Sequence, residues 1–259
     1  MAGFKVRSVL VTGANRGIGL ELVKQFLEKS NPPEWIFATC QDPEGERAQQ
    51  LKNLVSRHPN LAIVALEATD PASIKAAATR VEEHLKSSGL NLLINNAGIV
   101  RPSTLESETP EDMSLVYATN VTGLLLVSQA FLPLLKKAAQ GTPKPGLSCS
   151  KAAIVNISSE CGSIANLIAW ELVEVVSYRC SKAALNMLTK CQSLGYEGDG
   201  ILSIAVHPGW VQTDMGSTGS HQAPLTVDVS VQGILNVLPT LSKKDNGAFV
   251  NWEGKVLPW

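Results

Sequence analysis

The sequence lacks an excess of charge of either sign. Its 22 Lys and Arg residues nearly balance its 23 Asp and Glu residues, which leaves a formal net charge of −1 at pH 7. Proteins that bind nucleic acid or an anionic membrane surface usually concentrate basic residues on one face. We therefore expect no nucleic acid and no membrane among the partners of this chain.

Long hydrophobic runs are missing as well. Nowhere do about 20 apolar residues follow one another, which is the length that crosses a bilayer as a helix. The opening residues, MAGFKVRSVLVTG, lead straight into a predicted strand and contain no apolar segment followed by a cleavage site. These absences predict a soluble protein of the cytoplasm.

Cysteine is scarce, and its spacing is uninformative. The five cysteines form no CxxC pair and no cluster with His58, His84, His207 or His221 at metal-ligand spacing. Disulfide frameworks and zinc sites both need such patterns. We expect reduced thiols, no metal site, and a structural rather than catalytic role for His207, which precedes a proline.

What the sequence does contain is a regular alternation of two kinds of segment. Apolar segments bounded by turn residues are each followed by a longer segment of helical period. Apolar strands separated by helices form parallel sheets that are covered on both faces. Because no linker or repeat divides the chain, we expect one domain over residues 1–259 with a doubly wound α/β fold. The predicted strands lie in SVLVTG, WIFATC, LAIVALEAT, LNLLINNAG, AAIVNISS and ILSIAVHPG.

A glycine-rich turn follows the first of these strands. The segment VTGANRGIGLEL places Gly13, Gly17 and Gly19 where the strand gives way to a helix. Glycines at this point let the backbone approach a pyrophosphate, and the unpaired N–H groups of the helix N-terminus favour its charge. A plain tight turn would also use glycine. The position directly after the first strand favours a dinucleotide site.

A tyrosine and a lysine stand four residues apart in VVSYRCSKAALNML. At this spacing Tyr178 and Lys182 lie one turn apart on the same helical face, so both can reach one point. The common structural alternative is a half-buried ring beside a solvated amine. The pair alone does not decide between the two.

Six short motifs occur in order along the chain: TGANRGIG, NNAG at Asn95–Gly98, YATNVTG around Asn120, IVNISS ending at Ser159, YRCSK and HPGWVQTDMG. Together they resemble the short-chain dehydrogenase/reductase family. The segments ATCQDPEGE and GKVLPW look most like its sniffer and C-factor branch of carbonyl reductases. The resemblance implies a Rossmann-type fold of about seven strands with a nicotinamide cofactor.

The resemblance also implies a catalytic set of Asn120, Ser159, Tyr178 and Lys182. In the family, tyrosine is the general acid, lysine supports it and grips the nicotinamide ribose, and asparagine holds a water that relays protons. Ser159 would donate to the substrate oxygen as negative charge develops there. Ser158 is the competing serine, and Ser159 is preferred because it falls on the family's position.

The charge of Lys182 is sufficient in magnitude to assist a phenol. Lowering a tyrosine pKa from about 10 to about 7 requires roughly 4 kcal/mol. An ammonium about 4 Å away, at an effective dielectric constant near 20, supplies about that Coulomb energy. We therefore expect Lys182 to lower the pKa of Tyr178.

The end of the second predicted strand bears on the choice of cofactor. An acid there reads the bare ribose of NAD, but Cys40 occupies that place. Arg16 in the glycine turn can pair with a 2′-phosphate, whereas Gln41 adds no charge and Asp42 follows it. The sequence favours NADPH and leaves NAD possible.

The expected cofactor contacts come from the loops after the predicted strands. Glu67 is the candidate for the adenine amine. The full set is Gly13, Asn15, Arg16, Gly17, Ile18, Gly19, Gln41, Glu67, Asn96, Ala97, Gly98, Tyr178, Lys182, Pro208, Gly209, Val211 and Thr213.

The substrate side is less specific. Leu167, Ile168, Trp170 and Trp210 are candidates for an apolar pocket, although core packing or a subunit contact would explain them equally well. The short stretch from Ser217 to the helix predicted near Val227 suggests an open mouth. The family commonly forms dimers or tetramers, and the apolar segment Thr122–Leu135 is a candidate face unless the sheet covers it.

Three functions remain in view from the sequence. The first is NADPH-dependent reduction of ketones, aldehydes or quinones to alcohols, with Tyr178 as general acid. The second is an NAD-dependent alcohol or hydroxysteroid dehydrogenase. The third is a redox sensor that binds the nucleotide without turnover; four retained catalytic residues argue against it, because a silent site needs none of them.

Overall fold

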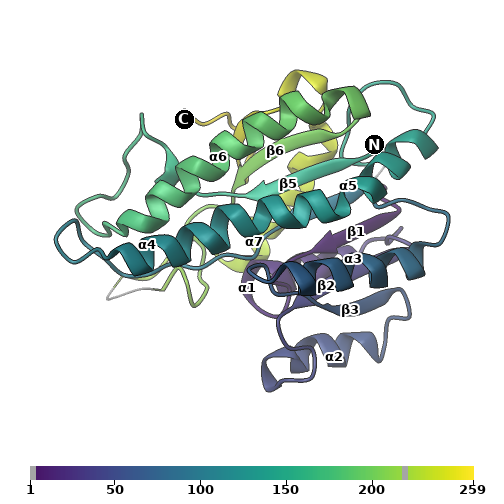
Figure 1. Cartoon of the computed structure of the whole chain (residues 1–259), viewed down its shortest axis with the longest axis horizontal. Helices are drawn as coiled ribbons and strands as arrows, with labels where there is room; N and C mark the ends of the chain where they lie inside the picture. Colours follow the sequence, from purple (N-terminus) through teal and green to yellow (C-terminus); the bar gives the residue numbers. More distant parts are fainter. Residues whose placement is uncertain (1–3, 218–220) are drawn as a thin grey trace.

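Seven parallel strands form one sheet in a computed structural model that describes residues 4–217 and 221–259 (Figure 1). The order across the sheet is β3-β2-β1-β4-β5-β6-β7, so the winding reverses between β1 and β4. The carboxyl ends of strands at such a reversal are where α/β proteins bind ligands. The strands are β1 (Ser8–Val11), β2 (Trp35–Cys40), β3 (Leu61–Ala65), β4 (Leu92–Asn95), β5 (Ala153–Ile157), β6 (Leu202–His207) and β7 (Phe249–Asn251).

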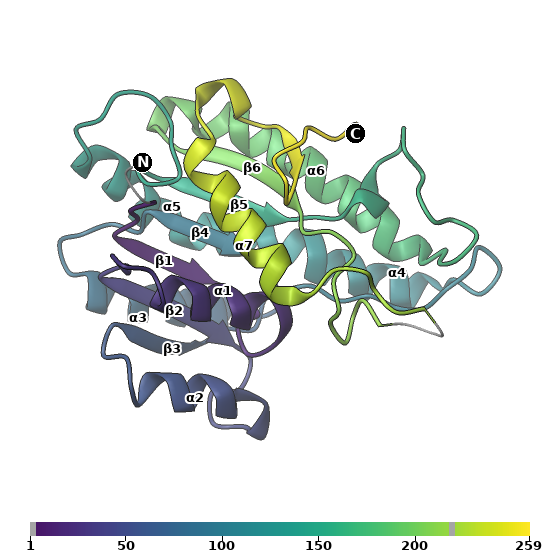
Figure 2. The same cartoon turned by 180° about the vertical axis from the view of Figure 1, so that it is seen from behind.

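Helices cover both faces of the sheet. One face carries α3 (Pro71–Leu85), α5 (Gly123–Gly141) and α6 (Val176–Tyr196), which lie in front in Figure 1. The other carries α1 (Gly17–Leu27), α2 (Gln49–Val55) and α7 (Val227–Val237), seen in Figure 2. Two apolar clusters fill the two layers, one against each face. This confirms the predicted doubly wound Rossmann-type fold with seven strands.

The short helical turns connect these elements. They are the 3₁₀ turns Glu46–Ala48, Glu160–Gly162, Glu197–Asp199, Leu238–Thr240 and Lys243–Asp245. The segment after α5 begins at Thr142, because Gly141 is the last residue of that helix. The segment after β5 contains the turn at Glu160–Gly162 and ends where α6 begins at Val176.

The long helical stretch from Pro110 to Gly141 is not uniform. It consists of α4 (Pro110–Tyr117), a π-helical turn (Ala118–Thr122) and α5. By length and composition alone, this helix could cross a membrane, since its most apolar window has a mean hydropathy of 1.5. Buried helices of water-soluble proteins share that property. Here 44% of the window is buried inside the fold, against α3 and the sheet.

Candidate active site

The loops that leave the carboxyl ends of the central strands form the candidate site. The glycine turn follows β1, Asn96–Gly98 follow β4, Ser159 follows β5 and Pro208–Gly209 follow β6. Because parallel strands end at the same edge, these segments converge, and the structure thus brings together motifs almost 200 residues apart in sequence.

The glycine turn is shaped for close approach of a ligand. Gly13 and Gly17 have φ values of +61° and +54°, which side chains rarely tolerate. A Cβ on Gly19 would lie 2.2 Å from the carbonyl oxygen of Gly13, so only glycine allows the helix to start against the turn. Arg16, the N-cap of α1, makes no side-chain capping bond. The N-terminus of this 11-residue helix is therefore open to a phosphate, and the cradle fits a dinucleotide.

The loop after β4 braces this turn. The side-chain nitrogen of Asn96 donates to the carbonyl oxygens of Thr12 and Gly13, at 3.1 and 3.2 Å. In return, the Thr12 hydroxyl accepts from the backbone N–H groups of Asn96 and Ala97, both at 3.0 Å. The Asn96 side chain is therefore committed to the protein, and its expected contribution to the cofactor site is to hold the glycine turn.

The loop after β6 closes the site from the other side. The Thr213 methyl lies 3.4 Å from the point where a Cβ on Gly17 would stand, so the two loops face one another closely. Gly209 has φ +89°, and a Cβ there would lie 2.7 Å from the Leu225 side chain. The carbonyl of Pro208 accepts from the Ser230 hydroxyl at 2.6 Å, which fixes this loop to α7. The predicted mouth segment includes residues 218–220, which lie outside the described residues.

Tyr178 and Lys182 lie on one face of α6, as their spacing predicts. The ammonium nitrogen of Lys182 is 5.5 Å from the centre of the Tyr178 ring and donates to the carbonyl of Ile157 at 2.9 Å. Lys182 is only 5% exposed. Burial lowers its pKa to about 8, and a contribution from nearby Cys161 opposes this. Gly98 lies close by, since a Cβ on it would stand 3.8 Å from the amine nitrogen.

The expectation that Lys182 lowers the pKa of Tyr178 is wrong for this structure. Burial raises the pKa of the phenol, and Cys161 adds to the increase, whereas a hydrogen bond with Ser159 lowers it. The physical reason is that removing a phenolate from water costs more than the favourable contacts return. The ammonium interacts with the ring and with a carbonyl instead of neutralising the phenolate.

The two adjacent serines point to different partners. The Ser158 hydroxyl donates to the side-chain oxygen of Asn186 at 2.6 Å and is buried against α6. The Ser159 hydroxyl accepts from the backbone N–H of Cys161 at 3.1 Å and lies near enough to the Tyr178 phenol to lower its pKa. Of the two, Ser159 shares the face of the phenol.

Asn120 lies in the π-helical turn and is fully buried. Its side-chain oxygen accepts from the N–H of Ile99 and its nitrogen donates to the Ile99 carbonyl, both at 2.9 Å. The same nitrogen donates to the Ser181 hydroxyl at 3.0 Å. Both amide hydrogens are thus used, and Asn120 joins the loop after β4 to the helix that carries Lys182.

The adenosine end is marked by charged and polar side chains around β2. Cys40 is 4% exposed at the end of the strand, with its pKa raised mainly by burial and then by Asp42. Arg16 forms an ion pair with Asp214 at 3.2 Å, and both side chains are well exposed. Gln41 is exposed beside them. A 2′-phosphate at this place would compete with Asp214 for the guanidinium.

At this end of the site, Glu67 makes contacts that differ from the expected adenine contact, and Arg47 is a neighbour that was not expected. One carboxylate oxygen of Glu67 accepts from the N–H and hydroxyl of Thr69, at 3.1 and 2.9 Å, so only the other is free for an adenine. Asn15 donates weakly to the carbonyl of Arg47 at 3.5 Å. The main chain of Arg47 therefore lies next to the glycine turn that contains Asn15. Nothing in the sequence pointed to Arg47, because it stands in a charged, solvent-facing segment.

The loop before α6 is held by a buried arginine that sequence analysis missed. The Arg179 guanidinium donates to the carbonyls of Ile168, Val173 and Glu174 at 3.0, 2.7 and 2.7 Å. It also lies over the Trp170 ring, 5.6 Å from its centre. Trp170 thus contacts Arg179. In the sequence, an arginine next to Tyr178 resembles an ordinary solvated side chain.

Leu167 and Trp210, two of the other candidate pocket residues, and Met215 in the loop after β6 are exposed at the surface. Leu167 is 54% exposed, Met215 37% and Trp210 38%. The Trp210 indole donates to the carbonyl of Gly216 at 2.8 Å, which leaves its ring faces available. A cavity of about 410 Å³ lies at the opposite, amino end of the strands, around Ser8 and Asn91.

The start of α6 depends on a carboxylate from a distant loop. Val175, the N-cap, has φ +37° and makes no side-chain capping bond. Glu108 instead accepts from the N–H of Ser177 at 2.9 Å, from the Ser177 hydroxyl, and from the Ser103 hydroxyl at 2.6 Å. These bonds lower the pKa of Glu108 to about 2. The glutamate therefore anchors the helix that carries Tyr178.

Comparison with known proteins gives consistent matches over most of the chain. Residues 7–224 match the family described as short chain dehydrogenase. The structure is similar to an NADPH-bound carbonyl reductase from chicken fatty liver, with 65% identity, a TM-score of 0.95, and coverage of 99% of this chain and 100% of that one. It is also similar to the carbonyl reductase Sniffer of D. melanogaster, with 36% identity, a TM-score of 0.92, and coverage of 98% and 100%. The C-signal protein of Myxococcus xanthus is 33% identical over 171 residues, which are 66% of this chain and 93% of that protein.

Proposed function

Because the chain belongs to the short-chain dehydrogenase family, we propose that it is a carbonyl reductase that uses NADPH to reduce ketones, aldehydes or quinones to alcohols. The single observation that carries this proposal is the similarity to the NADPH-bound chicken enzyme, at 65% identity over 99% of the chain. Sniffer, at 36% identity, supports the same reaction class. The substrate is then a small carbonyl compound, and the whole chain acts as one domain.

The site fits the cofactor by its own geometry. Positive φ values at Gly13 and Gly17, together with the open N-terminus of α1, suit the pyrophosphate. Ile18 and Val211 belong to the same two facing loops as Gly17 and Thr213. Arg16 and the absence of an acid at Cys40 favour a 2′-phosphate. When bound, the nicotinamide supplies a hydride, and the protein must supply the proton.

Tyr178 is the proposed proton donor. Because burial raises its pKa, the phenol keeps its proton at neutral pH and is ready to donate as the substrate oxygen gains charge. Ser159 adds a second donor on the same face. Lys182 places a positive charge beside the ring, and Asn120 fixes the loop and helix between which the lysine lies.

Replacing Tyr178 tests the proposal. With NADPH and a panel of quinones, aldehydes and ketones, Tyr178→Phe should lower kcat by about 100-fold or more, which is the usual contribution of a general acid. Tyr117→Phe is the matched control, because Tyr117 is 49% exposed on α4 and should leave kcat unchanged. A loss below about tenfold for Tyr178→Phe would exclude this role.

The same assay separates the other functions. Turnover of alcohols with NAD, and none of carbonyls with NADPH, would indicate the dehydrogenase. Tight nucleotide binding with no turnover in either direction would indicate a sensor.

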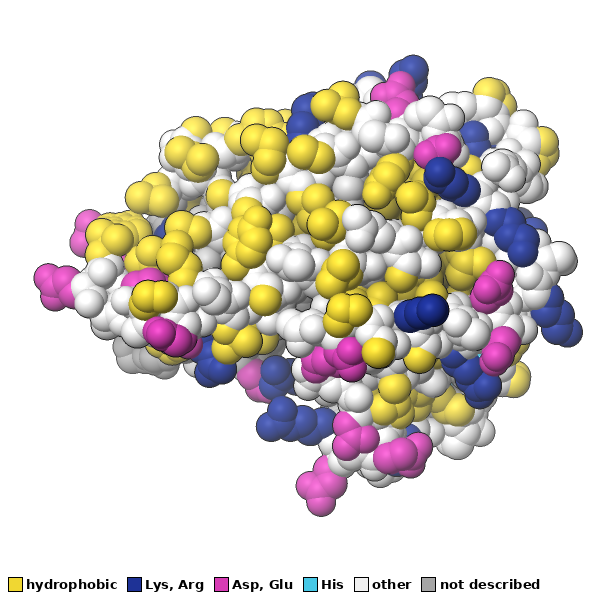
Figure 3. All heavy atoms as spheres, in the orientation of Figure 1, with side chains coloured by type: hydrophobic (Ala, Val, Ile, Leu, Met, Phe, Trp, Pro, Cys, Tyr) yellow, Lys and Arg dark blue, Asp and Glu magenta, His cyan; other side chains and the backbone are white. Residues whose placement is uncertain are grey.

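The chain is also proposed to act as a homodimer or homotetramer in the cytoplasm. Figure 3 shows hydrophobic side chains gathered over the part of the surface where α4 and α6 lie. They include Met113, Leu115 and Tyr117 on α4, and Met187 and Leu194 on α6, which are 39–73% exposed. A contiguous apolar surface of this kind is typical of a subunit contact.

A further inference from the structure

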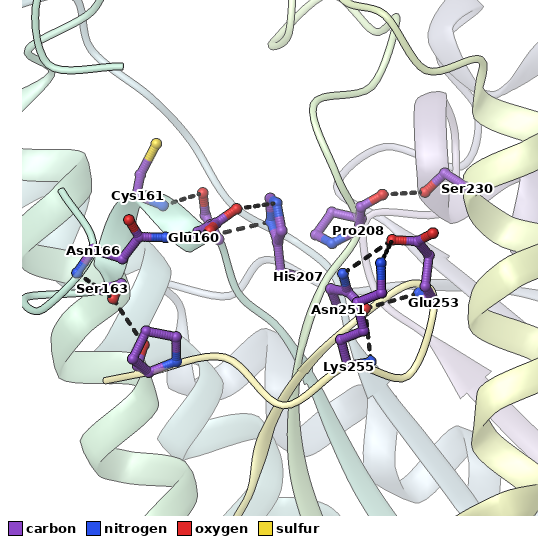
Figure 4. A network of polar contacts seen from close by, with 12 residues as sticks. Glu160, Cys161, Ser163, Asn166, His207, Pro208, Ser230, Asn251, Glu253 and Lys255 are labelled. Atoms are coloured by element: carbon purple, nitrogen blue, oxygen red, sulfur yellow. Dashed lines mark hydrogen bonds and ion pairs between the residues drawn. The ribbon is translucent and has the colours of Figure 1, made fainter. Parts of the chain in front are cut away.

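His207, the last residue of β6, contacts Glu160 at two points. Its Nδ1 accepts a hydrogen bond from the backbone N–H of Glu160 at 3.1 Å. Its Nε2 lies 3.5 Å from a carboxylate oxygen of the same residue. Figure 4 shows the imidazole facing Glu160, with Asn166 on the other side of that glutamate. The two side chains are only 12% and 21% exposed, so water competes little for these contacts.

The first contact fixes the protonation of the ring. A ring nitrogen that accepts from an N–H carries no proton, so the hydrogen of the neutral imidazole is on Nε2 and faces the carboxylate. Burial lowers the pKa of His207 to about 4, which keeps the ring neutral at physiological pH. The ring therefore presents one acceptor and one donor to a single residue.

Glu160 begins the turn that presents Ser159. The N–H of Cys161 donates to the Ser159 hydroxyl at 3.1 Å, and the N–H of Gly162 donates to the Ser159 carbonyl at 2.9 Å. Because Cys161 occupies one acceptor position of the hydroxyl, the hydroxyl hydrogen is directed away from the turn, on the side where Ser159 meets Tyr178. A change in the position of the Glu160 backbone would thus redirect the Ser159 hydroxyl.

The far end of the same segment is anchored independently. Asn166 donates to Glu160 at 2.7 Å, the Ser163 hydroxyl donates to the Pro258 carbonyl at 2.8 Å, and the N–H of Ala165 donates to the Trp259 carbonyl at 2.8 Å. Ser163 and Ala165 therefore keep their anchors at Pro258 and Trp259 if His207 is changed, whereas the Asn166 contact depends on Glu160 itself. The imidazole specifically controls the beginning of the segment, next to Ser159.

We propose that His207 is a positioning residue for Ser159, because its imidazole holds the Glu160 backbone and so fixes the turn that aims the serine hydroxyl at Tyr178 and the substrate oxygen. This proposal rests on the proposed reductase function and on the role of Ser159 in it. It assigns to His207 a task in catalysis without direct contact with substrate.

Two amide substitutions test the proposal, because both introduce the same neutral amide and differ in which ring nitrogen it replaces. In His207→Asn, the amide oxygen can stand where Nδ1 stands and accept from the Glu160 N–H. In His207→Gln, the longer side chain carries its amide toward the place of Nε2 and leaves that N–H without an acceptor. We expect His207→Asn to stay within about threefold of the native kcat and His207→Gln to lose about tenfold, with NADPH affinity unchanged in both. Ser8→Ala, which removes buried hydrogen bonds at the opposite end of the sheet, controls for a general loss of stability.

The Ser159→Ala background shows whether His207 acts through the serine. If it does, His207→Gln should lower kcat in the native protein and have almost no further effect in Ser159→Ala, because coupled positions are not additive. Equal losses in both backgrounds, equal activities of His207→Asn and His207→Gln, or a parallel loss in Ser8→Ala would overturn the proposal. If Ser159→Ala itself keeps full activity, the role of Ser159 in the proposed function fails; if only His207→Gln is without effect, the failure is confined to His207.

Discussion

At the scale of single residues, the pKa shifts of Tyr178 and Lys182 are the reverse of those expected for an ion pair between a phenolate and an ammonium group. Burial raises the pKa of Tyr178 and lowers that of Lys182 to about 8, so each group is shifted toward its neutral form. A neutral phenol is the form that donates a proton, and a charged lysine is the form that assists it. The proposed reaction therefore depends on a lysine that loses its charge in the mildly alkaline range.

This dependence predicts a pH profile. The kcat/KM of carbonyl reduction should fall as pH rises through about 8, because deprotonated Lys182 no longer provides a positive charge. The measurement is kcat/KM from pH 6 to 10 with a substrate that does not itself titrate. Lys182→Arg keeps its charge throughout this range and should show a flatter profile, at a lower overall rate. A native profile that is level up to pH 10 would contradict the assignment.

The ion pair between Arg16 and Asp214 leads to a prediction about the cofactor. If Arg16 binds the 2′-phosphate, then Arg16→Gln should raise the Kd for NADPH by about tenfold, which corresponds to one charge-assisted hydrogen bond. Asp214→Asn removes the competing partner and should lower the Kd for NADPH. Neither change should affect NADH, which lacks this phosphate. Equal effects on both nucleotides, measured by fluorescence titration, would place the phosphate elsewhere.

The positions of the candidate site residues in the fold were more predictable from the sequence than their contacts. The spacing of Tyr178 and Lys182 sufficed to place them on one helical face, and the strand end sufficed to place Ser159. The hydrogen bonds that occupy the Asn96 and Asn120 side chains could not be predicted, because the backbone groups they bind lie far away in sequence. The predicted direction of the Tyr178 pKa shift was wrong, because burial of the phenol depends on the fold and cannot be read from the spacing of two residues.

At the scale of secondary-structure elements, α6 is the helix on which the site is built. It carries Tyr178 and Lys182 on one face, and its Ser181 and Asn186 contact Asn120 and Ser158. The π-helical turn at Ala118–Thr122 places Asn120 opposite this helix. Such turns are often found at functional sites, and the ordinary helical spacing of the sequence did not predict one.

The anchoring of the start of α6 by Glu108 predicts a specific pH dependence of stability. Glu108→Gln should lower the free energy of unfolding at pH 7 by about 1 kcal/mol, since it removes an anion from a helix N-terminus. The pKa of Glu108 falls from 4.5 to about 2 on folding, so its stabilisation is complete above pH 4.5 and is lost as pH falls toward 2. The difference between native and variant protein in urea unfolding should therefore shrink below pH 4.5. A constant difference across this range would mean that the charge of Glu108 does not contribute.

At the scale of the whole molecule, the alternation of apolar and helical segments was enough to predict the sheet. Strands buried on both faces have few alternatives to a parallel arrangement, and the structure confirms it. The course of the loop before α6 was not predictable, because Arg179 and Glu108 reach it from separate parts of the chain. From the sequence, the apolar stripe of the long helix could be either a subunit contact or a face covered by the sheet. Only the fold shows how much of it is buried.

The exposed apolar surface over α4 and α6 predicts self-association. Met187→Glu, on α6 at 65% exposure, should shift the protein to a smaller species in light scattering coupled to gel filtration. Val229→Glu, at 45% exposure on α7 on the opposite side of the sheet, is the matched control and should leave the mass unchanged. A native protein that already runs as a monomer would contradict the proposed oligomer.

The guanidinium of Arg179 donates hydrogen bonds to the main-chain carbonyls of Ile168, Val173 and Glu174, and none of these bonds involves their side chains. An anchor of this kind is indifferent to which amino acids occupy those positions. Substitutions at Ile168, Val173 or Glu174 should therefore change the surface of this loop while its main chain keeps its path and Tyr178, the proposed proton donor, keeps its place.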